Sequence, residues 1–478
     1  MSSAVLPADI VRAYDIRGTV PEQIDEPVAR RVGNAFGQWL VRRGAESVVV
    51  GRDARASSPT LYESAIEGLR GAGIDVFSAG LSSTPVIGWA VDQLGLGGGL
   101  IVTASHNPPE YNGFKLLAAQ AQPLLPDEIL EIARTRPAQS AAVGKRHELD
   151  ASSPYLELLH QRFGHETELN VAIDPGSGTT ALTAPAALTS MGARVHAIRA
   201  TPRAAAVAAD PQEPSQLREL AGVVTAVNAV LGIAWDGDGD RIGVLDHLGR
   251  RYEADWLTAV LARPLLARRP GAEVLLDMKT SSSVIEDIGR RGGAAMSSRT
   301  GYSFFRRAMR ERQMSFGGET SGHIMFGPEY RPGEHAPWID DGVYAACALL
   351  SYLSERGRTL AEEMTEIEPR PISPELRLPC PDDQKASVAA RIGHWFAEHH
   401  RDSQIDRSDG ARVTLADGWL HARASNTAPV LSLRFEAVDE AAYRRIAEQL
   451  HSALSQHASV SGTDQLDEPP IIGPQSVI

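Results

Sequence analysis

Four short stretches rich in side chains that bind or transfer phosphate groups are spread along the 478-residue chain. They are residues 103–108 (TASHNP), 236–241 (DGDGDR), 318–323 (GETSGH) and 423–427 (RASNT). Each stretch taken alone has an ordinary interpretation as a polar turn, because short motif matches are only hypotheses. Together they offer a serine, a metal site, a sugar-binding pair and a phosphate-binding group.

The first stretch follows an apolar strand expected at residues 100–102, and Pro108 and Pro109 at its end forbid a helix. Ser105 is therefore expected on a loop just past the carboxyl end of a buried strand, where open α/β sheets place their ligand sites. His106, Asn107 and Lys115 supply hydrogen-bond donors nearby. The loop is suited to holding a phosphate on or near a serine, and the alternative is a turn with a capping serine.

The second stretch places Asp236, Asp238 and Asp240 at alternate positions, so their carboxylates point the same way on a locally extended backbone. Mg²⁺ prefers such oxygen ligands together with a substrate phosphate oxygen. An EF-hand calcium loop is excluded, because Arg241 replaces its turn glycine and His247 its closing glutamate. An acidic hairpin turn remains possible, but three uncompensated carboxylates would repel one another, which favours a metal site.

The third stretch carries Glu319, Ser321 and His323 on a glycine-rich loop. Glu319 and Ser321 can bind adjacent hydroxyls of a sugar ring, because one accepts hydrogen bonds and the other both donates and accepts. His323 can transfer a proton near neutral pH. The alternative is a polar turn with a satisfied histidine.

The fourth stretch combines one cation with short hydrogen-bonding side chains, a set that fits a phosphate dianion. Its members are Arg423, Ser425, Asn426 and Thr427. The alternative is a β-turn, because serine and asparagine are common turn residues.

The elements that must position these loops alternate between strand and helix through most of the chain, which favours α/β domains with mostly parallel sheets. We expect three similar mixed α/β domains and a smaller C-terminal α+β domain. A cluster of prolines between residues 366 and 374 marks the last boundary. The expected domains span residues 1–150, 151–252, 253–367 and 368–457, and residues 458–478 are expected to form a flexible tail.

The composition is that of a globular enzyme, with 43% hydrophobic and 22% charged residues. Its 47 basic and 60 acidic residues give a net charge of -13, which argues against nucleic acid or an anionic membrane as a partner. Two cysteines provide neither a disulfide framework nor zinc-ligand spacing. No signal-peptide pattern opens the sequence, and no window reaches ~18 apolar residues, so we expect a cytoplasmic protein.

The four stretches in this order closely resemble the α-D-phosphohexomutase superfamily, specifically its phosphomannomutase/phosphoglucomutase branch. The similarity covers about residues 8–455. The stretches correspond, in sequence order, to that family's phosphoserine, metal, sugar and phosphate loops. The resemblance implies that the four domains surround one central cleft and that the ligands are hexose phosphates.

The resemblance also implies a mechanism. Ser105 would carry a phosphoryl group, donate it to a hexose 1- or 6-phosphate, and recover the other phosphate from the 1,6-bisphosphate intermediate. Asp236, Asp238 and Asp240 would hold Mg²⁺ together with the Ser105 phosphate, and glucose 1,6-bisphosphate would act as an activator. Lys115, His323, Arg17 and Arg241 would serve catalysis, Glu319 and Ser321 would hold the sugar, and Arg423, Ser425, Asn426, Thr427, Lys279, Tyr14 and Tyr302 would face the substrate phosphate.

The sequence departs from the branch pattern at three places, of which the first two bear mainly on sugar preference. Tyr302 stands where close relatives carry a phosphate-binding histidine, and Thr320 replaces a methionine. Residues 203–209 lack an expected Pro-Asn-His run. Alternatives are a phosphoglucosamine mutase, against which the RASNT loop argues, a metal-dependent phosphatase, and an inactive sugar-phosphate-binding protein. The sequence does not rank mannose against glucose, and a monomer or dimer is expected.

Overall fold

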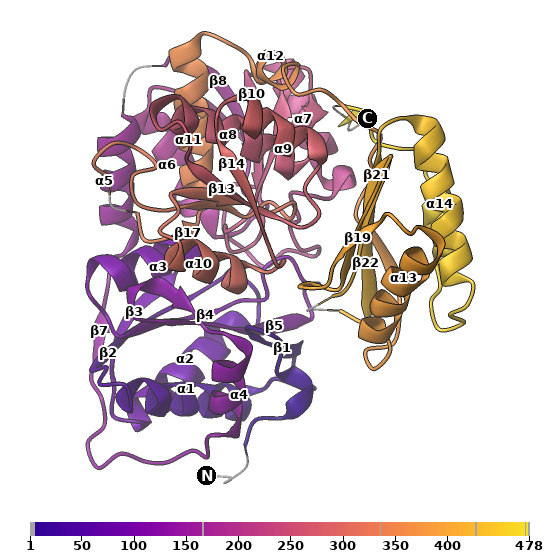
Figure 1. Cartoon of the computed structure of the whole chain (residues 1–478). Helices are drawn as coiled ribbons and strands as arrows, with labels where there is room; N and C mark the ends of the chain where they lie inside the picture. Colours follow the sequence, from indigo (N-terminus) through magenta and orange to yellow (C-terminus); the bar gives the residue numbers. More distant parts are fainter. Residues whose placement is uncertain (1–4, 165–166, 335, 426–427, 474, 477–478) are drawn as a thin grey trace.

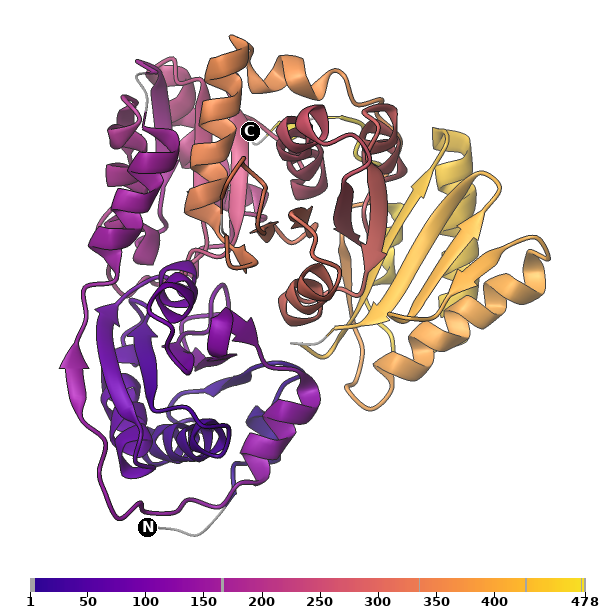
Figure 2. The same cartoon turned by 60° about the vertical axis from the view of Figure 1, so that its left-hand side comes forward.

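The computed structural model describes residues 5–164, 167–334, 336–425, 428–473 and 475–476. It contains four sheets with helices packed beside them, which we number as domains I to IV (Figure 1). A second view shows domain I below domains II and III, with domain IV on one side (Figure 2). The architecture of three α/β domains and one α+β domain is the one expected from the sequence.

Domain I is built on a mixed sheet in which the buried strand β4 lies between β5 and β2. Pairing is parallel between β4 and β2 and antiparallel between β4 and β5, so the loop after β4 opens at the carboxyl edge of the parallel strands. Its strands are β1 (Ile16–Thr19), β2 (Ser47–Arg52), β3 (Asp75–Leu81), β4 (Gly98–Val102), β5 (Tyr111–Ala118), β6 (Gln122–Pro123) and β7 (Arg146–Glu148), and its helices α1 (Glu26–Val41), α2 (Ser58–Gly71), α3 (Thr84–Gln93) and α4 (Pro126–Arg134).

Domain II carries its metal-loop candidate between β10 and β11, two buried antiparallel strands. The neighbouring strand β8 runs parallel to β10, so both end at the same edge of the sheet. Its elements are α5 (Ser152–Phe163), β8 (Asn170–Asp174), α6 (Ala184–Ser190), β9 (Arg194–Ala197), α7 (Pro214–Ala226), β10 (Leu231–Trp235), β11 (Ile242–Asp246) and β12 (Arg250–Arg251).

Domain III places its sugar-loop candidate between β15 and β16, again an antiparallel pair beside a parallel one. Helix α11 begins where the Asp341 carboxylate accepts hydrogen bonds from two backbone amides of its first turn. The elements are α8 (Ala254–Arg268), β13 (Glu273–Asp277), α9 (Ser282–Arg290), β14 (Ala294–Ser298), α10 (Tyr302–Glu311), β15 (Phe316–Gly318), β16 (Ile324–Phe326), β17 (Ile339–Asp340), α11 (Gly342–Arg356) and α12 (Leu360–Met364).

Domain IV is an antiparallel sheet in the order β18-β22-β21-β20-β19 with two long helices. Its buried apolar side chains form their own core, whereas one continuous core joins residues of domains I, II and III. Domain IV is therefore the most independent body of the four. Its elements are β18 (Leu376–Pro379), α13 (Lys385–His399), β19 (Gln404–Asp406), β20 (Ala411–Leu415), β21 (Gly418–Ala424), β22 (Val430–Ala437) and α14 (Glu440–Leu454).

The last part of the chain, expected to be a flexible tail, makes specific contacts where it is described. A 3₁₀ turn at Thr463–Asp467 packs on domain IV with Leu466 buried. Strand β23 (Gln475–Ser476) then pairs with β12 of domain II. Composition did not reveal this, because the segment has no hydrophobic period and its partners lie far away in the sequence.

Candidate active site

Residues from all four domains line one cavity of about 420 Å³. Every predicted catalytic side chain faces it, namely Ser105, Lys115, His323, Arg17 and Arg241. Predicted substrate-binding residues that line it are Glu319, Ser321, Arg423, Ser425, Lys279, Tyr14 and Tyr302. Two more predicted phosphate ligands, Asn426 and Thr427, lie outside the described residues. The four stretches chosen from the sequence thus converge on one cleft.

Ser105 lies three residues beyond the end of β4, on the loop expected from the sequence. Its φ of 54° places it in the left-handed region, which is uncommon for a residue other than glycine and marks a constrained loop. Its hydroxyl donates a 2.5 Å hydrogen bond to Asp236 Oδ2 and lies 3.0 Å from His106 Nδ1. Its backbone N–H donates to the Thr103 hydroxyl at 2.9 Å. The serine is therefore held from two domains.

Arg55 fixes the shape of the serine loop from behind. Its guanidinium donates to the carbonyl oxygens of Ser105 at 2.8 Å and Asn107 at 2.6 Å, and also to those of Pro108 and Tyr111. The Asp53 carboxylate receives a further hydrogen bond from Arg55 Nε at 3.2 Å. Sequence reasoning missed both residues, because the loop that Arg55 holds is about fifty residues away and no local pattern reports that contact.

The three loop aspartates are buried and bring ligand oxygens within 4.8 Å of one another. One oxygen each of Asp238 and Asp240 is buried with no hydrogen-bond partner among the described residues. Burial, together with the charges of Asp238 and Asp240, raises the pKa of Asp236 well above its usual range. Such a group of carboxylates needs a cation, and its all-oxygen donor set fits Mg²⁺.

In the described structure, Lys115 on β5 provides positive charge to this cluster. Its ammonium donates to Asp238 Oδ2 at 2.7 Å and also contacts Asp240. Burial alone would lower the pKa of Lys115, but Asp238 and Asp240 raise it well above normal, so the side chain is held protonated. Thr84, which sequence reasoning missed, donates to the same Asp238 oxygen at 2.6 Å.

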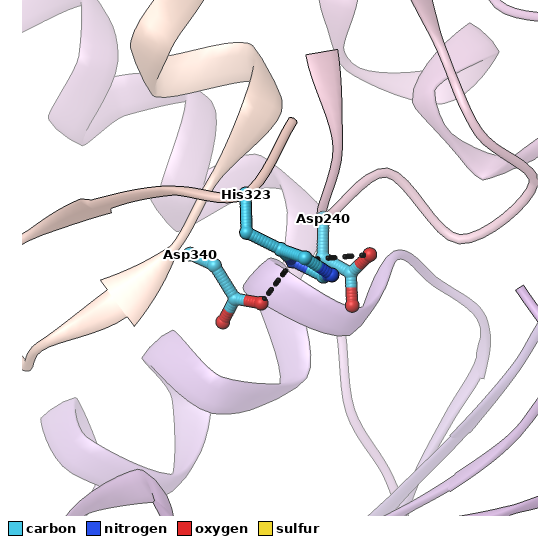
Figure 3. A group of neighbouring side chains, drawn as sticks. All are labelled: Asp240, His323 and Asp340. Carbon is cyan, nitrogen blue, oxygen red and sulfur yellow. Dashed lines mark ion pairs between the residues drawn. The ribbon is translucent and has the colours of Figure 1, made fainter. Parts of the chain in front are cut away.

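His323 lies between two acidic side chains, Asp240 and Asp340 (Figure 3). Its Nδ1 is 2.7 Å from Asp340 Oδ2 and 3.8 Å from Asp240 Oδ1. Its Nε2 accepts a 3.0 Å hydrogen bond from Arg241 Nε. This network assigns the ring proton to Nδ1 and leaves Nε2 as the basic nitrogen. Asp340, at the end of β17, was not singled out in the sequence.

The sugar-loop candidate is held by hydrogen bonds to two neighbouring segments of domain III. Glu319 Oε1 accepts from the Gly301 N–H at 2.6 Å, and burial raises the pKa of this carboxyl. The amide and hydroxyl of Thr320 both donate to Asp277 Oδ2, at 2.9 and 2.6 Å. Thr320, one of the departures from the branch pattern, thus anchors the loop to the end of β13.

The phosphate-loop candidate follows β21 of domain IV. Arg423 Nε lies 3.1 Å from Asp409 Oδ2, and that carboxylate also accepts from the Thr300 N–H of domain III at 2.9 Å. Burial would lower the pKa of Arg423, but Asp409 and Tyr14 raise it, so the guanidinium stays charged. Lys279 of domain III forms an ion pair with Glu375 of domain IV at 2.6 Å, so this boundary carries an ion pair as well as the Thr300–Asp409 hydrogen bond.

Two tyrosines close the side of the cleft between domains I and III. The rings of Tyr14 and Tyr302 meet edge to face with centroids 5.0 Å apart, and Lys115 Nζ lies 5.5 Å from the centre of the Tyr302 ring. The Tyr302 hydroxyl is buried and has no hydrogen-bond partner among the described residues. A polar ligand atom in the cleft would satisfy it.

A serine beside three buried aspartates, with a cationic cleft assembled from four domains, defines a phosphoryl-transfer enzyme. Models of the phosphoglucomutase/phosphomannomutase family match residues 8–141 (α/β/α domain I), 153–249 (domain II), 253–370 (domain III) and 375–453 (C-terminal domain). The chain belongs to this family, and the family, fold class and isomerase class expected from the sequence are confirmed.

Individual relatives agree with this assignment. The chain is 35% identical over 457 residues to phosphomannomutase/phosphoglucomutase of Pseudomonas aeruginosa, covering 92% of this chain and 94% of the relative. It is 33% identical over 462 residues to phosphoglucomutase of Neisseria gonorrhoeae, covering 94% and 98%. A crystal structure of a phosphoglucomutase/phosphomannomutase family protein from Burkholderia thailandensis superposes with a TM-score of 0.83 at 29% identity, covering 98% of this chain and all of that one. Among the described residues, no helix is both long and apolar enough to cross a bilayer.

Proposed function

We propose that the protein interconverts hexose 1-phosphates and hexose 6-phosphates, with mannose, glucose or both as the sugar, through a phosphoserine at Ser105. The observation that carries the proposal is the contact between the Ser105 hydroxyl and Asp236 inside a cleft lined by all four domains. Family membership supports the reaction class, and the Pseudomonas relative bears both mutase names.

In this proposal Ser105 Oγ is the atom that gives and takes the phosphoryl group. Arg55 and Thr103 fix the loop that presents Oγ to the cleft. A bound sugar hydroxyl can then attack the phosphorus of the phosphoserine in line. The carboxylates of Asp236, Asp238 and Asp240 would hold Mg²⁺ with an oxygen of the phosphoserine. Bound there, Mg²⁺ supplies positive charge that stabilises the transferring phosphoryl group.

His323 and Arg241 are placed to handle the reacting sugar hydroxyl. Once Arg241 turns toward an incoming phosphate, His323 Nε2 is exposed to accept the hydroxyl proton, and Asp340 stabilises the resulting imidazolium. Arg17 helps to hold the serine loop, because its guanidinium donates to Asn107 Oδ1 at 2.7 Å. Lys115 balances the acidic cluster and orients its carboxylates.

The remaining groups would hold the sugar phosphate in either orientation. Glu319 and Ser321 would bind ring hydroxyls, while Arg423 and Ser425 would bind the phosphate that is not reacting, with Asn426 and Thr427 as further predicted ligands. Because this phosphate-binding group is fixed, a bisphosphate that reorients can present its other end to Ser105. Glucose 1,6-bisphosphate would activate the enzyme by loading the serine. A cytoplasmic location and a monomeric or dimeric state remain predictions.

Product analysis by phosphorus NMR tests this function. The protein is incubated with Mg²⁺, trace glucose 1,6-bisphosphate and, separately, the 1-phosphates of mannose, glucose and glucosamine. The proposal expects the 6-phosphates of mannose, glucose or both. Conversion of glucosamine 1-phosphate alone would identify a phosphoglucosamine mutase, free inorganic phosphate a phosphatase, and binding without turnover an inactive sugar-phosphate-binding protein.

A further inference from the structure

The last described residues leave domain IV and join the sheet of domain II. After the turn at Thr463–Asp467 has packed on domain IV, the chain continues to β23, which extends the domain II sheet beyond its edge strand β12. This segment lies beyond residue 453, where the match to the C-terminal family domain ends.

The first attachment of this segment is to domain IV. The backbones of Ile471 and Ile372 exchange two hydrogen bonds of 2.7 and 3.2 Å, in an antiparallel bridge. Their side chains form a small buried cluster with Trp419 of β21. Ile472, the next residue, points outward and is 47% exposed. Because Ile471 is buried against domain IV while Ile472 faces solvent, this stretch packs specifically on the surface of domain IV.

The second attachment is to domain II. Gln475 lies opposite Arg251 in the pairing of β23 with β12, and Arg251 Nη1 donates to Gln475 Oε1 at 3.1 Å. The same guanidinium nitrogen donates to Glu253 at 2.6 Å. Arg251 is only 5% exposed, and its Nε has no hydrogen-bond partner among the described residues. The buried Arg251 guanidinium beside β23 therefore has a donor that is free to bind a ligand.

Both attachments border the cleft. Ile471, Gln475 and Arg251 line the same 420 Å³ cavity as Ser105 and Arg423. The segment is thus a wall of the candidate active site as well as a connection between two domains.

Such a connection would restrain domain IV relative to the other three domains. Its apolar core is separate from the core that joins the other three domains. Its described contacts with domain III include polar ones, such as Arg434 with Asp255 at 3.1 Å and Ser281 with Glu436 at 2.5 Å. Interfaces of this polar kind permit relative domain motion. Arg423 sits on domain IV, so any such motion changes its distance from Ser105.

We propose that the described residues 469–473 and 475–476 form a strap that holds domain IV against domain II and so positions Arg251 and the phosphate-binding residues of domain IV for the substrate. The strap rests on the proposed function in that the cleft is taken as the hexose-phosphate site. The strap residues help to set the shape of the cleft, and they take no direct part in the phosphoryl transfer at Ser105.

The kinetic test uses two variants and a matched control. Ending the chain after Glu468 removes the strap but keeps the turn that buries Leu466, and Ile471→Ala weakens the strap in the full-length chain. Ile472→Ala removes the same atoms from the exposed neighbour. We expect both strap variants to raise KM for glucose 1-phosphate about fivefold with kcat within about twofold of wild type, because uniform substrate binding is lost. The control should match wild type, and Ile471→Val should restore most of the affinity.

Hydrogen exchange without substrate separates the strap from the proposed reaction. If the strap holds domain IV, exchange at the Ser282 amide, which donates to Glu436 across the domain III–IV boundary at 3.1 Å, becomes faster in both strap variants and stays unchanged in the control. Unchanged exchange there, or an unchanged KM despite faster exchange, would overturn the proposal. A wild-type protein without mutase activity would contradict the proposed function, while the exchange result would still decide whether the strap holds the domains.

Discussion

The hydroxyl of Ser105 in domain I donates a 2.5 Å hydrogen bond to the carboxylate of Asp236 in domain II. The two residues are 131 positions apart and follow strands of two different sheets. Such a contact exists only when the two domains are docked, and the apolar core that they share keeps them so. The candidate reaction centre is therefore a property of the interface between the domains.

Asp236→Asn tests the acidic side of this contact. An amide can still accept the Ser105 hydrogen bond but loses the negative charge that a metal ligand provides, so we expect turnover to fall about a hundredfold or more at saturating Mg²⁺. Steady-state rates with glucose 1-phosphate measure the effect. Asp402→Asn, which removes a carboxylate from an exposed turn of domain IV, should leave the rate unchanged. Near-normal turnover of the Asp236 variant would exclude it from the metal site.

Arg55→Lys tests the anchoring of the serine loop. Lysine keeps the charge but cannot reach four carbonyl oxygens at once, so Ser105 should be less well oriented. We expect kcat to fall about tenfold while KM changes less than about twofold, the signature of a lost transition-state interaction. Arg52→Lys is the matched control, because Arg52 donates only to the Asp53 carbonyl among its described contacts. An equal loss in both variants would show a general stability effect.

Asp409→Asn tests how Arg423 is held. The Asp409 carboxylate binds Arg423 and the Thr300 amide, so its loss frees the guanidinium and weakens the domain III–IV contact. We expect KM for hexose phosphates to rise about tenfold, equivalent to about 1.4 kcal/mol of binding. Asp402→Asn changes an exposed carboxylate elsewhere in domain IV and should have no effect. A fall in kcat at constant KM would contradict the assigned role.

His421 predicts a pH dependence of stability in domain IV. Burial lowers its pKa from 6.5 to about 4, and its Nε2 donates to the Asp409 carbonyl at 2.6 Å. The unfolded chain binds the proton more readily, so the free energy of unfolding should fall as pH drops from 6.5 toward 4, by at most about 3 kcal/mol from this residue. His421→Gln keeps a donor but cannot titrate. Urea unfolding curves at several pH values should show a flatter profile for the variant, and identical profiles would refute the prediction.

Local sequence patterns were sufficient for part of this site. Asp236, Asp238 and Asp240 could be assigned together because alternation along one extended stretch brings their carboxylates close. Ser105 could be placed after a buried strand for a similar local reason. That Ser105 faces Asp236 was implied only by the family resemblance, because nothing in spacing relates residues 131 positions apart.

The residues that sequence reasoning missed share a physical cause. Each of them holds another site residue that is distant in the sequence. They are Arg55, Asp340, Asp277 and Asp409. Their types are common in turns and at strand ends, so only the fold shows what they contact. The strap was missed for the same reason, because its short strand β23 forms only by pairing with β12, which is distant in the sequence.

The most direct test of the account follows a labelled phosphoryl group. Protein radiolabelled with phosphate on Ser105 is mixed with unlabelled glucose 1-phosphate and Mg²⁺, and protein, sugar phosphates and inorganic phosphate are separated after one turnover. The account predicts that the label leaves Ser105 and appears in hexose bisphosphate and hexose 6-phosphate, and that a Ser105→Ala chain takes up no label. Label released as inorganic phosphate, or retained on the protein while product forms, would contradict it.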